Sequence, residues 1–263
     1  GKINNFDILE KIPGHDSLNN FEYLKNINLH DYNIIFNNSD YDESTILTYS
    51  KYWIESQKKT KIKNGSFGFF KTHNARVNIN NNYYTDSSTT MGFIYIYRDP
   101  RDVSVSYSKH MNKDIIEVVN FLLDGQIMEK EKINNKMPEI LLNWNDHYLS
   151  WKKFSNQVPS LFIRYEDCLD DLEKEINKII KFFSTNFNLD ITNKEKKIKN
   201  IIKTTSFENL KNIEKTYGFI ERSDKVDFFR NGNKNQWFKS LSNELSLKIE
   251  KRFFDQMKTF KYL

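Results

Sequence analysis

The chain has 263 residues, of which 38% are hydrophobic and 15% aromatic, so it carries enough apolar side chains for a large core. Its net charge of +5 suits an anionic ligand, but basic and acidic residues alternate, which excludes the clustered basic stripe of a dedicated nucleic-acid binder. A single cysteine, Cys168, excludes an internal disulfide and a multi-cysteine metal site. We expect a cytoplasmic protein with one domain, residues 1–263, and with no membrane span.

The region before residue 92 has weak patterns. Residues 1–38 predict irregular structure around one short helix, and residues 43–58 predict an amphipathic helix. Residues 67–71 are a short apolar run, which is typical of a strand. We expect a polar loop over residues 74–90.

Residues 92–107 have the clearest local pattern. Their first half is a run of β-branched and aromatic residues, which predicts a buried strand, and Pro100 then fits the first position of a helix. Arg98 lies at the carboxyl end of this strand, and Ser106 lies within the helix. Ligands bind at that edge of a parallel α/β sheet, and an Arg beside a helix N-terminus favours an anion. The stretch therefore predicts a phosphate site.

The second half alternates helices with strands. We expect helices over residues 114–123, 141–154, 193–203 and 245–260, and a strand over residues 158–165. Asp170 or Asp171 caps a further amphipathic helix. A polar segment follows residues 204–207. Strands separated by helices indicate an α/β fold, with a parallel β-sheet flanked by helices.

Five short motifs, in order along the chain, resemble those of the sulfotransferases that use 3′-phosphoadenosine 5′-phosphosulfate (PAPS). They are Lys71-Thr72-His73, the stretch from Arg98 to Tyr107, Arg164-Tyr165-Glu166-Asp167, Thr205-Ser206-Phe207, and Phe229-Arg230-Asn231-Gly232 followed by Trp237. The resemblance covers residues 67–263 and implies the sulfotransferase fold, which is related to that of P-loop NTPases. Each motif alone is unspecific, but the order of all five is hard to obtain by chance.

The resemblance implies catalytic roles for two residues. His73 would be the general base that takes a proton from the acceptor, since a neutral imidazole suits this role near pH 7. Lys71 would face the same side of the strand and stabilise negative charge on the bridging oxygen. The alternatives are a structural or surface histidine and a solvated lysine. The other four histidines are interpreted as structural.

The resemblance also implies a set of nucleotide-binding residues. Their groups are cations, hydroxyls, an aromatic face and a glycine loop that suit the 3′-phosphate and adenine. They are Arg98, Ser106, Tyr165, Thr205, Ser206, Phe207, Arg230, Asn231 and Gly232.

Each of these residues also has a structural interpretation. Arg98 could instead pair with Asp99 or Asp102, and Phe207 could simply pack in the core. We interpret Arg101 as a surface cation. Glu166 and Asp167 would orient neighbours or cap a turn, because adjacent side chains on an extended chain point apart.

The sequence departs from the family pattern in two places. The family's Arg-Lys-Gly reads Arg230-Asn231-Gly232, so a neutral residue replaces one cation. The Pro-Lys-Ser-Gly-Thr-Thr-Trp loop that wraps the 5′-phosphosulfate is not found. Either the chain begins after this loop or the loop has been lost, and the first is more economical because the other motifs look intact.

These observations favour an enzyme that transfers a sulfuryl group from PAPS, without a metal, and releases adenosine 3′,5′-bisphosphate (PAP). The acceptor would be a hydroxyl or amine of a small molecule or carbohydrate. The alternative is a non-catalytic nucleotide-binding or interaction domain of the same fold. A kinase of related topology is disfavoured because no Gly-Lys-Ser/Thr phosphate loop is present. The acceptor and the oligomeric state are left open.

Overall fold

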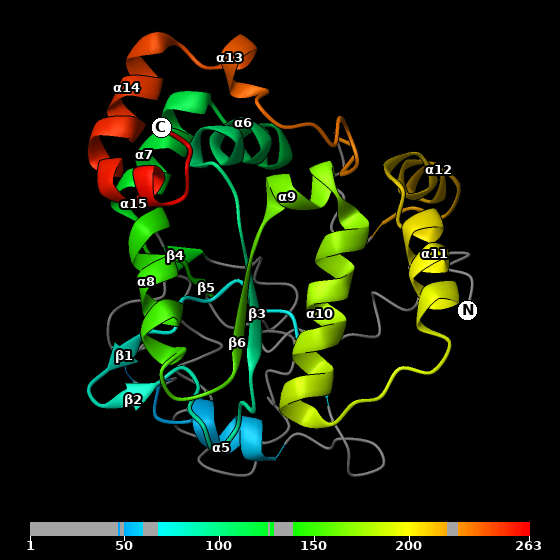
Figure 1. Cartoon of the computed structure of the whole chain (residues 1–263). Helices are drawn as coiled ribbons and strands as arrows, with labels where there is room; N and C mark the ends of the chain where they lie inside the picture. Colours follow the sequence, from blue (N-terminus) through cyan, green and yellow to red (C-terminus); the bar gives the residue numbers. More distant parts are fainter. Residues whose placement is uncertain (1–46, 48–49, 60–67, 126, 129–138, 220–225) are drawn as a thin grey trace. The chain divides into compact units, whose positions relative to one another are not determined.

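The computed structural model describes residues 47, 50–59, 68–125, 127–128, 139–219 and 226–263 (Figure 1). The chain divides into two compact units. In the described ranges, unit 1 holds residues 93–123 and 159–263, and unit 2 holds the rest. The sequence expectations for residues 1–38 and the start of the helix expected at residue 43 lie outside the described residues. The expected single domain stays a prediction.

Unit 1 is built on two parallel strands. β3 (Phe93–Tyr97) pairs with β6 (Ser160–Arg164), and the register sets Tyr97 opposite Arg164. The ring of Phe162 on β6 packs against Phe93 and Tyr95 on β3, with centroids 5.8 and 5.7 Å apart. Aromatic pairs at this spacing stabilise neighbouring strands. Both strands were expected from the sequence.

Each of these strands leads directly into a helix at the same edge of the sheet (Figure 1). α6 (Pro100–Met111) follows β3, and α9 (Tyr165–Asp170) follows β6. The Asp99 side chain caps α6 by accepting a hydrogen bond from the N–H of Arg101, and Pro100 occupies the first helical turn. The strand, turn and helix expected over residues 92–107 are confirmed, with the helix extending to Met111.

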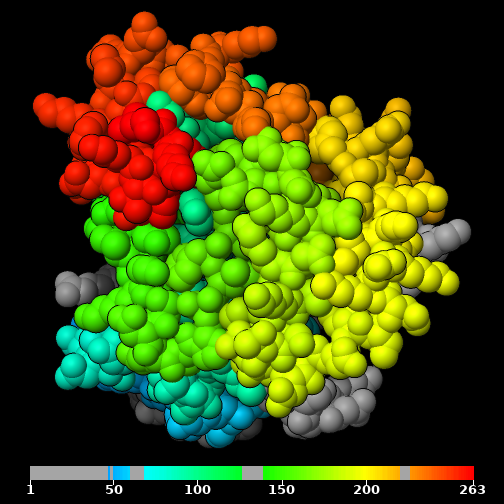
Figure 2. Space-filling view, in the orientation of Figure 1, coloured from blue at the N-terminus to red at the C-terminus, as the bar shows by residue number. Residues whose placement is uncertain are grey.

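The middle of unit 1 is helical. α7 (Ile115–Asp124), α10 (Leu172–Phe187) and α11 (Lys194–Thr204) match the expected helices. Asp171, one of the two expected caps, caps α10 by accepting from the N–H of Lys174. α10 packs against α11 around a cluster of Ile176, Ile180 and Ile198. Figure 2 shows the surfaces of the two helices in contact.

The C-terminal part of unit 1 differs from the sequence expectation in two places. The polar segment after residue 206 is a helix, α12 (Phe207–Tyr217), capped by Ser206. The single expected terminal helix is interrupted at Phe253 into α14 (Asn243–Arg252) and α15 (Phe254–Thr259), after the short α13 (Trp237–Ser240). Phe253 is 3% exposed, so burying its ring accompanies the break in the helix.

Unit 2 contains short elements around one longer helix. α5 (Trp53–Lys58) and α8 (Trp144–Phe154) lie within expected helices. Residues 74–90 form more than a loop, since β1 (Asn78–Ile79) and β2 (Asn82–Tyr83) make an antiparallel hairpin. Its turn, Asn80-Asn81, has φ of 49° and 67°, the left-handed conformation that Asn tolerates in tight hairpins. β4 (Ile127–Met128) pairs with β5 (Glu139–Ile140).

The strand expected at residues 67–71 is wrong for its described part, residues 68–71, where only Lys71 forms an isolated bridge. Side chains bind the neighbouring backbone instead of a strand ladder. The N–H of Asn74 donates to Thr72 Oγ1 at 3.0 Å, and Asn74 Oδ1 accepts from the N–H of Ile140 at 2.7 Å. The first of these bonds joins residues two apart and is of the local kind that competes with a sheet ladder.

Candidate active site

One face of α6 organises the loop that precedes α13. The Asp102 carboxylate is 1% exposed and accepts hydrogen bonds from the N–H groups of Asn235, at 2.7 Å, and Trp237, at 3.0 Å. A buried carboxylate is stable only when hydrogen bonds or charges satisfy it, and these main-chain donors supply that. The loop is therefore fixed to the first turn of α6, close to the end of β3.

Arg98, at the carboxyl end of β3, joins the same loop. Its Nη2 donates to the carbonyl of Asn233 at 2.8 Å and lies 3.5 Å from Asp102 Oδ2. Its guanidinium also stacks 4.5 Å from the ring centroid of Tyr165, the first residue after β6. The structure thus brings together Arg98 and Tyr165 from two neighbouring strand ends. The alternative pairing of Arg98 with Asp102 is present as a long contact within this larger set.

Arg230 reaches the next turn of α6. Its Nη2 donates to the Ser106 carbonyl at 3.1 Å and approaches Ser106 Oγ at 3.4 Å. Burial lowers the pKa of Arg230, and the positive charge of Arg98 lowers it further. Two guanidinium groups and a hydroxyl therefore share one region of unit 1. An anion there would receive charge-assisted hydrogen bonds and relieve the repulsion between the guanidiniums.

Gly232 and Phe207 are also brought together. A Cβ added at Gly232 would lie only 2.4 Å from Cδ2 of the Phe207 ring, and the φ of Gly232 is +59°. Both the space and the backbone conformation therefore require glycine. Asn231, between Arg230 and Gly232, is exposed, and its Nδ2 donates to Gln236 Oε1 at 3.1 Å.

Thr205 and Ser206 bind the chain itself. Thr205 Oγ1 donates to the carbonyl of Ile201 at 2.8 Å, at the end of α11. Ser206 Oγ accepts from the N–H of Asn209 at 3.3 Å and donates to the carbonyl of Lys203 at 3.2 Å. These hydroxyls stabilise the junction of α11 and α12 that carries Phe207.

Arg101 is not a surface cation, because it is only 5% exposed. It forms an ion pair with Asp99 at 2.7 Å and with Glu250 at 2.5 Å, and its Nη2 donates to the carbonyl of Tyr262. Burial opposes the charge, but the hydrogen bonds that Arg101 donates to the carboxylates of Asp99 and Glu250 raise the pKa of Arg101 overall. The indole ring of Trp237 covers its guanidinium at 3.9 Å. Arg101 therefore joins the C-terminus to the start of α6.

Glu166 orients its neighbours, as expected. Its Oε1 accepts from the N–H of Asp99 at 3.1 Å, and its Oε2 accepts from the hydroxyl of Tyr262 at 2.9 Å. Burial raises the pKa of Tyr262, and the charge of Glu166 raises it further, so this phenol remains a donor. Asp167 pairs with Arg164 at 2.6 Å. Sequence reasoning missed Tyr262, because no local pattern marks a C-terminal tyrosine.

The two candidate catalytic residues lie in unit 2. Lys71 and His73 are both exposed. Because the strand expected here does not form, their facing the same side stays a prediction. Main-chain contacts hold the segment in place. The carbonyl of His73 lies 3.1 Å from His147 Nε2, and the next carbonyl, of Asn74, accepts from Trp151 Nε1 at 3.0 Å.

His147 is a residue that sequence reasoning left as structural, and its contact places it beside the candidate base. It lies on α8, and burial lowers its pKa. The imidazole is therefore neutral near pH 7, and Nε2–H donates to the carbonyl of His73. The spacing of His147 and Trp151, four residues apart on a helix, puts both donors on one face. This spacing was the sequence pattern from which a role for His147 could have been predicted.

Known proteins are similar to this chain in sequence. Residues 7–261 match the family model described as a sulfotransferase domain. The chain is 30% identical over 175 residues to an amine sulfotransferase of Oryctolagus cuniculus, covering 64% of this chain and 54% of that protein. It is 29% identical over 196 residues to a flavonol 4′-sulfotransferase of Flaveria chlorifolia, covering 66% and 59%. The chain thus spans just over half the length of these relatives.

Among solved structures, the chain is similar to a retinol dehydratase in complex with androsterone and the inactive cofactor PAP. The TM-score is 0.56 at 19% identity, covering 93% of this chain and 76% of that one. At this identity the similarity concerns the fold. Together with the family match, it confirms the expected sulfotransferase fold, in which helices flank a small parallel sheet.

Proposed function

This chain belongs to the sulfotransferase domain family, and from that membership we propose that it transfers a sulfuryl group from PAPS to a hydroxyl or amine acceptor. The observation that carries the proposal is the convergence of Arg98, Ser106 and Arg230 at the edge where β3 and β6 end. The proposed acceptor is a small molecule or a carbohydrate. The names of the two relatives, one an amine and one a flavonol sulfotransferase, support these acceptor classes.

The residues present fit the nucleotide half of PAPS. A 3′-phosphate offers a doubly charged acceptor to two guanidiniums and a hydroxyl, and it would offset the repulsion that lowers the pKa of Arg230. The close approach of Gly232 to Phe207 provides a backbone surface beside an aromatic ring, which suits a phosphate next to adenine. PAP in the similar retinol dehydratase structure supports this assignment.

The proposed chemistry needs one base. When bound, the donor supplies an activated sulfuryl group. His73 accepts the proton of the acceptor hydroxyl or amine as the acceptor forms its new bond to sulfur. The bond between sulfur and the 5′-phosphate oxygen breaks, and PAP leaves with that oxygen. Lys71, two residues from His73, donates to the oxygen on which negative charge develops. No residue is oxidised or reduced, so no redox partner is required.

We propose a cytoplasmic location, with which a single free cysteine is compatible. In the described part of the chain, no helix is both long and apolar enough to cross a bilayer.

A second candidate is a non-catalytic nucleotide-binding domain of the same fold. It applies if the protein has no Pro-Lys-Ser-Gly-Thr-Thr-Trp loop for the 5′-phosphosulfate, and residues 1–263 contain none. Such a protein would keep the 3′-phosphate residues but would not position the sulfuryl group.

One experiment separates the two candidates. The protein is incubated with PAPS and a panel of alcohols, phenols and amines, and PAP release and sulfated product are both quantified. PAP binding is measured in parallel by calorimetry. We expect product with at least one acceptor class. PAP binding without transfer would select the non-catalytic domain, and no PAP binding at millimolar ligand would contradict both.

A further inference from the structure

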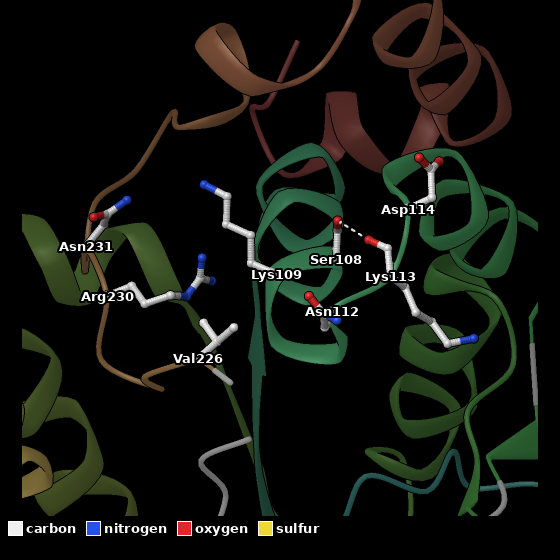
Figure 3. Close-up of a pocket in the computed structure, with 8 residues that line it drawn as sticks. All are labelled: Ser108, Lys109, Asn112, Lys113, Asp114, Val226, Arg230 and Asn231. Atoms are coloured by element: carbon white, nitrogen blue, oxygen red, sulfur yellow. Dashed lines mark hydrogen bonds between the residues drawn. The ribbon is translucent and has the colours of Figure 1, made fainter. Parts of the chain in front are cut away.

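Unit 1 contains a cavity of about 660 Å³ beside the candidate phosphate site. It lies between the end of α6 and the loop of residues 226–231 (Figure 3). Its lining is polar and carries three cationic side chains. The lining residues are Ser108, Lys109, Asn112, Lys113, Asp114, Val226, Arg230 and Asn231.

The loop side of this cavity has one cation, Arg230, and a neutral residue at position 231. Where the resembled family has Arg-Lys-Gly, this chain has Arg230-Asn231-Gly232. The amide of Asn231 is exposed and turned toward Gln236, to which it donates at 3.1 Å. Asn231 therefore offers no positive charge to an anion held by Arg230.

The helix side of the cavity offers a positive charge instead. Asp102, Ser106 and Lys109 are four and three residues apart, so they lie along one face of α6. Asp102 and Ser106 both accept hydrogen bonds from the loop, Asp102 from the N–H of Asn235 and the Ser106 carbonyl from Arg230. Lys109 continues this face by one turn, and Figure 3 shows its ammonium extending toward the loop that carries Arg230 and Asn231.

The two lysines that line the cavity differ in their partners. Lys113 forms an ion pair with Glu117, which offsets its charge. Within the described ranges, the Lys109 ammonium has no ion pair, and Lys109 is exposed. Its position in the last turn of α6 gives only the weak benefit of a cation near a helix C-terminus. Lys109 is thus the lysine of this cavity that remains able to bind an anion.

We propose that Lys109 supplies, from α6, the positive charge that the loop lacks at position 231, and that it binds the nucleotide 3′-phosphate together with Arg230. This inference rests on the proposed function. A phosphate monoester has three terminal oxygens and carries close to two negative charges, so it can accept from both guanidiniums and an ammonium at once.

The test compares PAP with adenosine 5′-monophosphate, which lacks the 3′-phosphate, by calorimetry at low salt. Lys109→Gln is expected to weaken PAP binding roughly tenfold, the scale of a charge-assisted contact, and to leave the monophosphate within about twofold. Lys113→Gln, in the same cavity, is the matched control and should bind PAP within about twofold of the unsubstituted chain. Adding Asn231→Lys to Lys109→Gln should restore most of the lost affinity.

Each outcome decides between named alternatives. Unchanged PAP binding by Lys109→Gln overturns this inference alone. Equal weakening of both nucleotides also overturns it, because a role in folding would explain that result. If the unsubstituted chain binds no PAP, the proposed function fails together with this inference.

Discussion

The two units hold their candidate residues in different ways. In unit 1, Arg98 and Arg230 are positioned through their own guanidiniums, which already bind the chain. In unit 2, the bonds that fix the His73 segment run through its main-chain carbonyl and that of Asn74. A substitution in unit 1 therefore changes binding and loop structure together, whereas a substitution of His73 can remove chemistry and leave the main-chain contacts in place.

A network of charged and polar groups lies behind the unit 1 site. Arg101 connects Asp99, Glu250 and the carbonyl of Tyr262, and the hydroxyl of Tyr262 reaches Glu166. These groups come from the start of α6, the start of α9 and the C-terminus. Buried charges that are fully paired resist rearrangement, because separating them leaves an unpaired charge in a poorly solvated place. In the described part of unit 2, hydrogen bonds link mainly neutral groups: Gln57 Oε1 accepts from the hydroxyls of Thr85 and Thr89, and the Thr85 carbonyl accepts from Arg76 Nε.

The largest expected effect is on chemistry in unit 2. His73→Ala should lower the rate of sulfate transfer by about 10²- to 10⁴-fold, the usual contribution of a general base. PAP affinity should stay within about twofold, because the nucleotide residues lie in unit 1. His73→Gln keeps a polar side chain but cannot accept a proton near pH 7, so it should lose the same activity. A transfer assay combined with PAP calorimetry makes the comparison. Full activity of either variant would remove His73 as the base.

The second-largest expected effect is on PAP binding in unit 1, where two glycine substitutions are compared. Gly232→Ala places a methyl group against the Phe207 ring, at a φ of +59°, whereas Gly218→Ala, at a φ of +78°, meets nothing within 4 Å. Both variants strain the backbone by about 1–3 kcal/mol. Only Gly232→Ala also displaces Phe207 and should weaken PAP binding.

Thermal unfolding and PAP calorimetry on both glycine variants give the result. We expect lower melting temperatures for both and a loss of PAP affinity, about tenfold, only for Gly232→Ala. Equal PAP affinity in the two variants would contradict the placement of Phe207 and Gly232 at the nucleotide.

The smallest expected effect is on transfer activity, through the hydrogen bond between His147 and the His73 carbonyl. His147→Phe removes the donor to the His73 carbonyl and should lower transfer about two- to tenfold, the usual worth of one hydrogen bond. His147→Gln can still donate and is the matched control. PAP affinity should not change in either variant.

The same histidine gives a pH dependence of stability. Burial lowers the pKa of His147 below its usual value, so the unfolded chain binds more protons than the folded one below about pH 6.5. The stability gained by keeping the buried imidazole neutral is therefore complete above that pH, and it is lost as the pH falls. Denaturant unfolding between pH 7.5 and about 5 should show a smaller loss of stability for His147→Phe than for the unsubstituted chain. Identical curves would contradict the burial of a neutral imidazole.

The sequence predicted best where the signals are local. The aromatic strand, the Asp99 cap and Pro100 are adjacent, so the strand, turn and helix of β3 and α6 follow from a few residues. The convergence of Arg98, Ser106 and Arg230 required the resemblance, since Arg230 lies 124 residues after Ser106. Nothing local connects those two positions.

The expectations from the sequence that proved wrong also have physical causes. Arg101 looked like a surface cation because its partners, Glu250 and Tyr262, lie 149 and 161 residues away. The apolar run before Lys71 predicted a strand, but the chain after it is held by side chains: the Thr72 hydroxyl accepts from the N–H of Asn74, and the Asn74 side chain accepts from the N–H of Ile140. α12 was missed because its apolar residues are few, although its cap, Ser206, was visible.

The central claim is that unit 1 binds a nucleotide through its 3′-phosphate, and one measurement tests it most directly. Calorimetric titration of PAP and adenosine 5′-monophosphate is carried out on the unsubstituted chain, on Arg98→Ala and on Arg252→Ala, an exposed arginine of α14. We predict that Arg98→Ala weakens PAP by about 1.5–3 kcal/mol and weakens the monophosphate by less, through the loop alone, while Arg252→Ala changes neither. Equal affinity of the unsubstituted chain for both nucleotides, or intact PAP binding by Arg98→Ala, would contradict the claim.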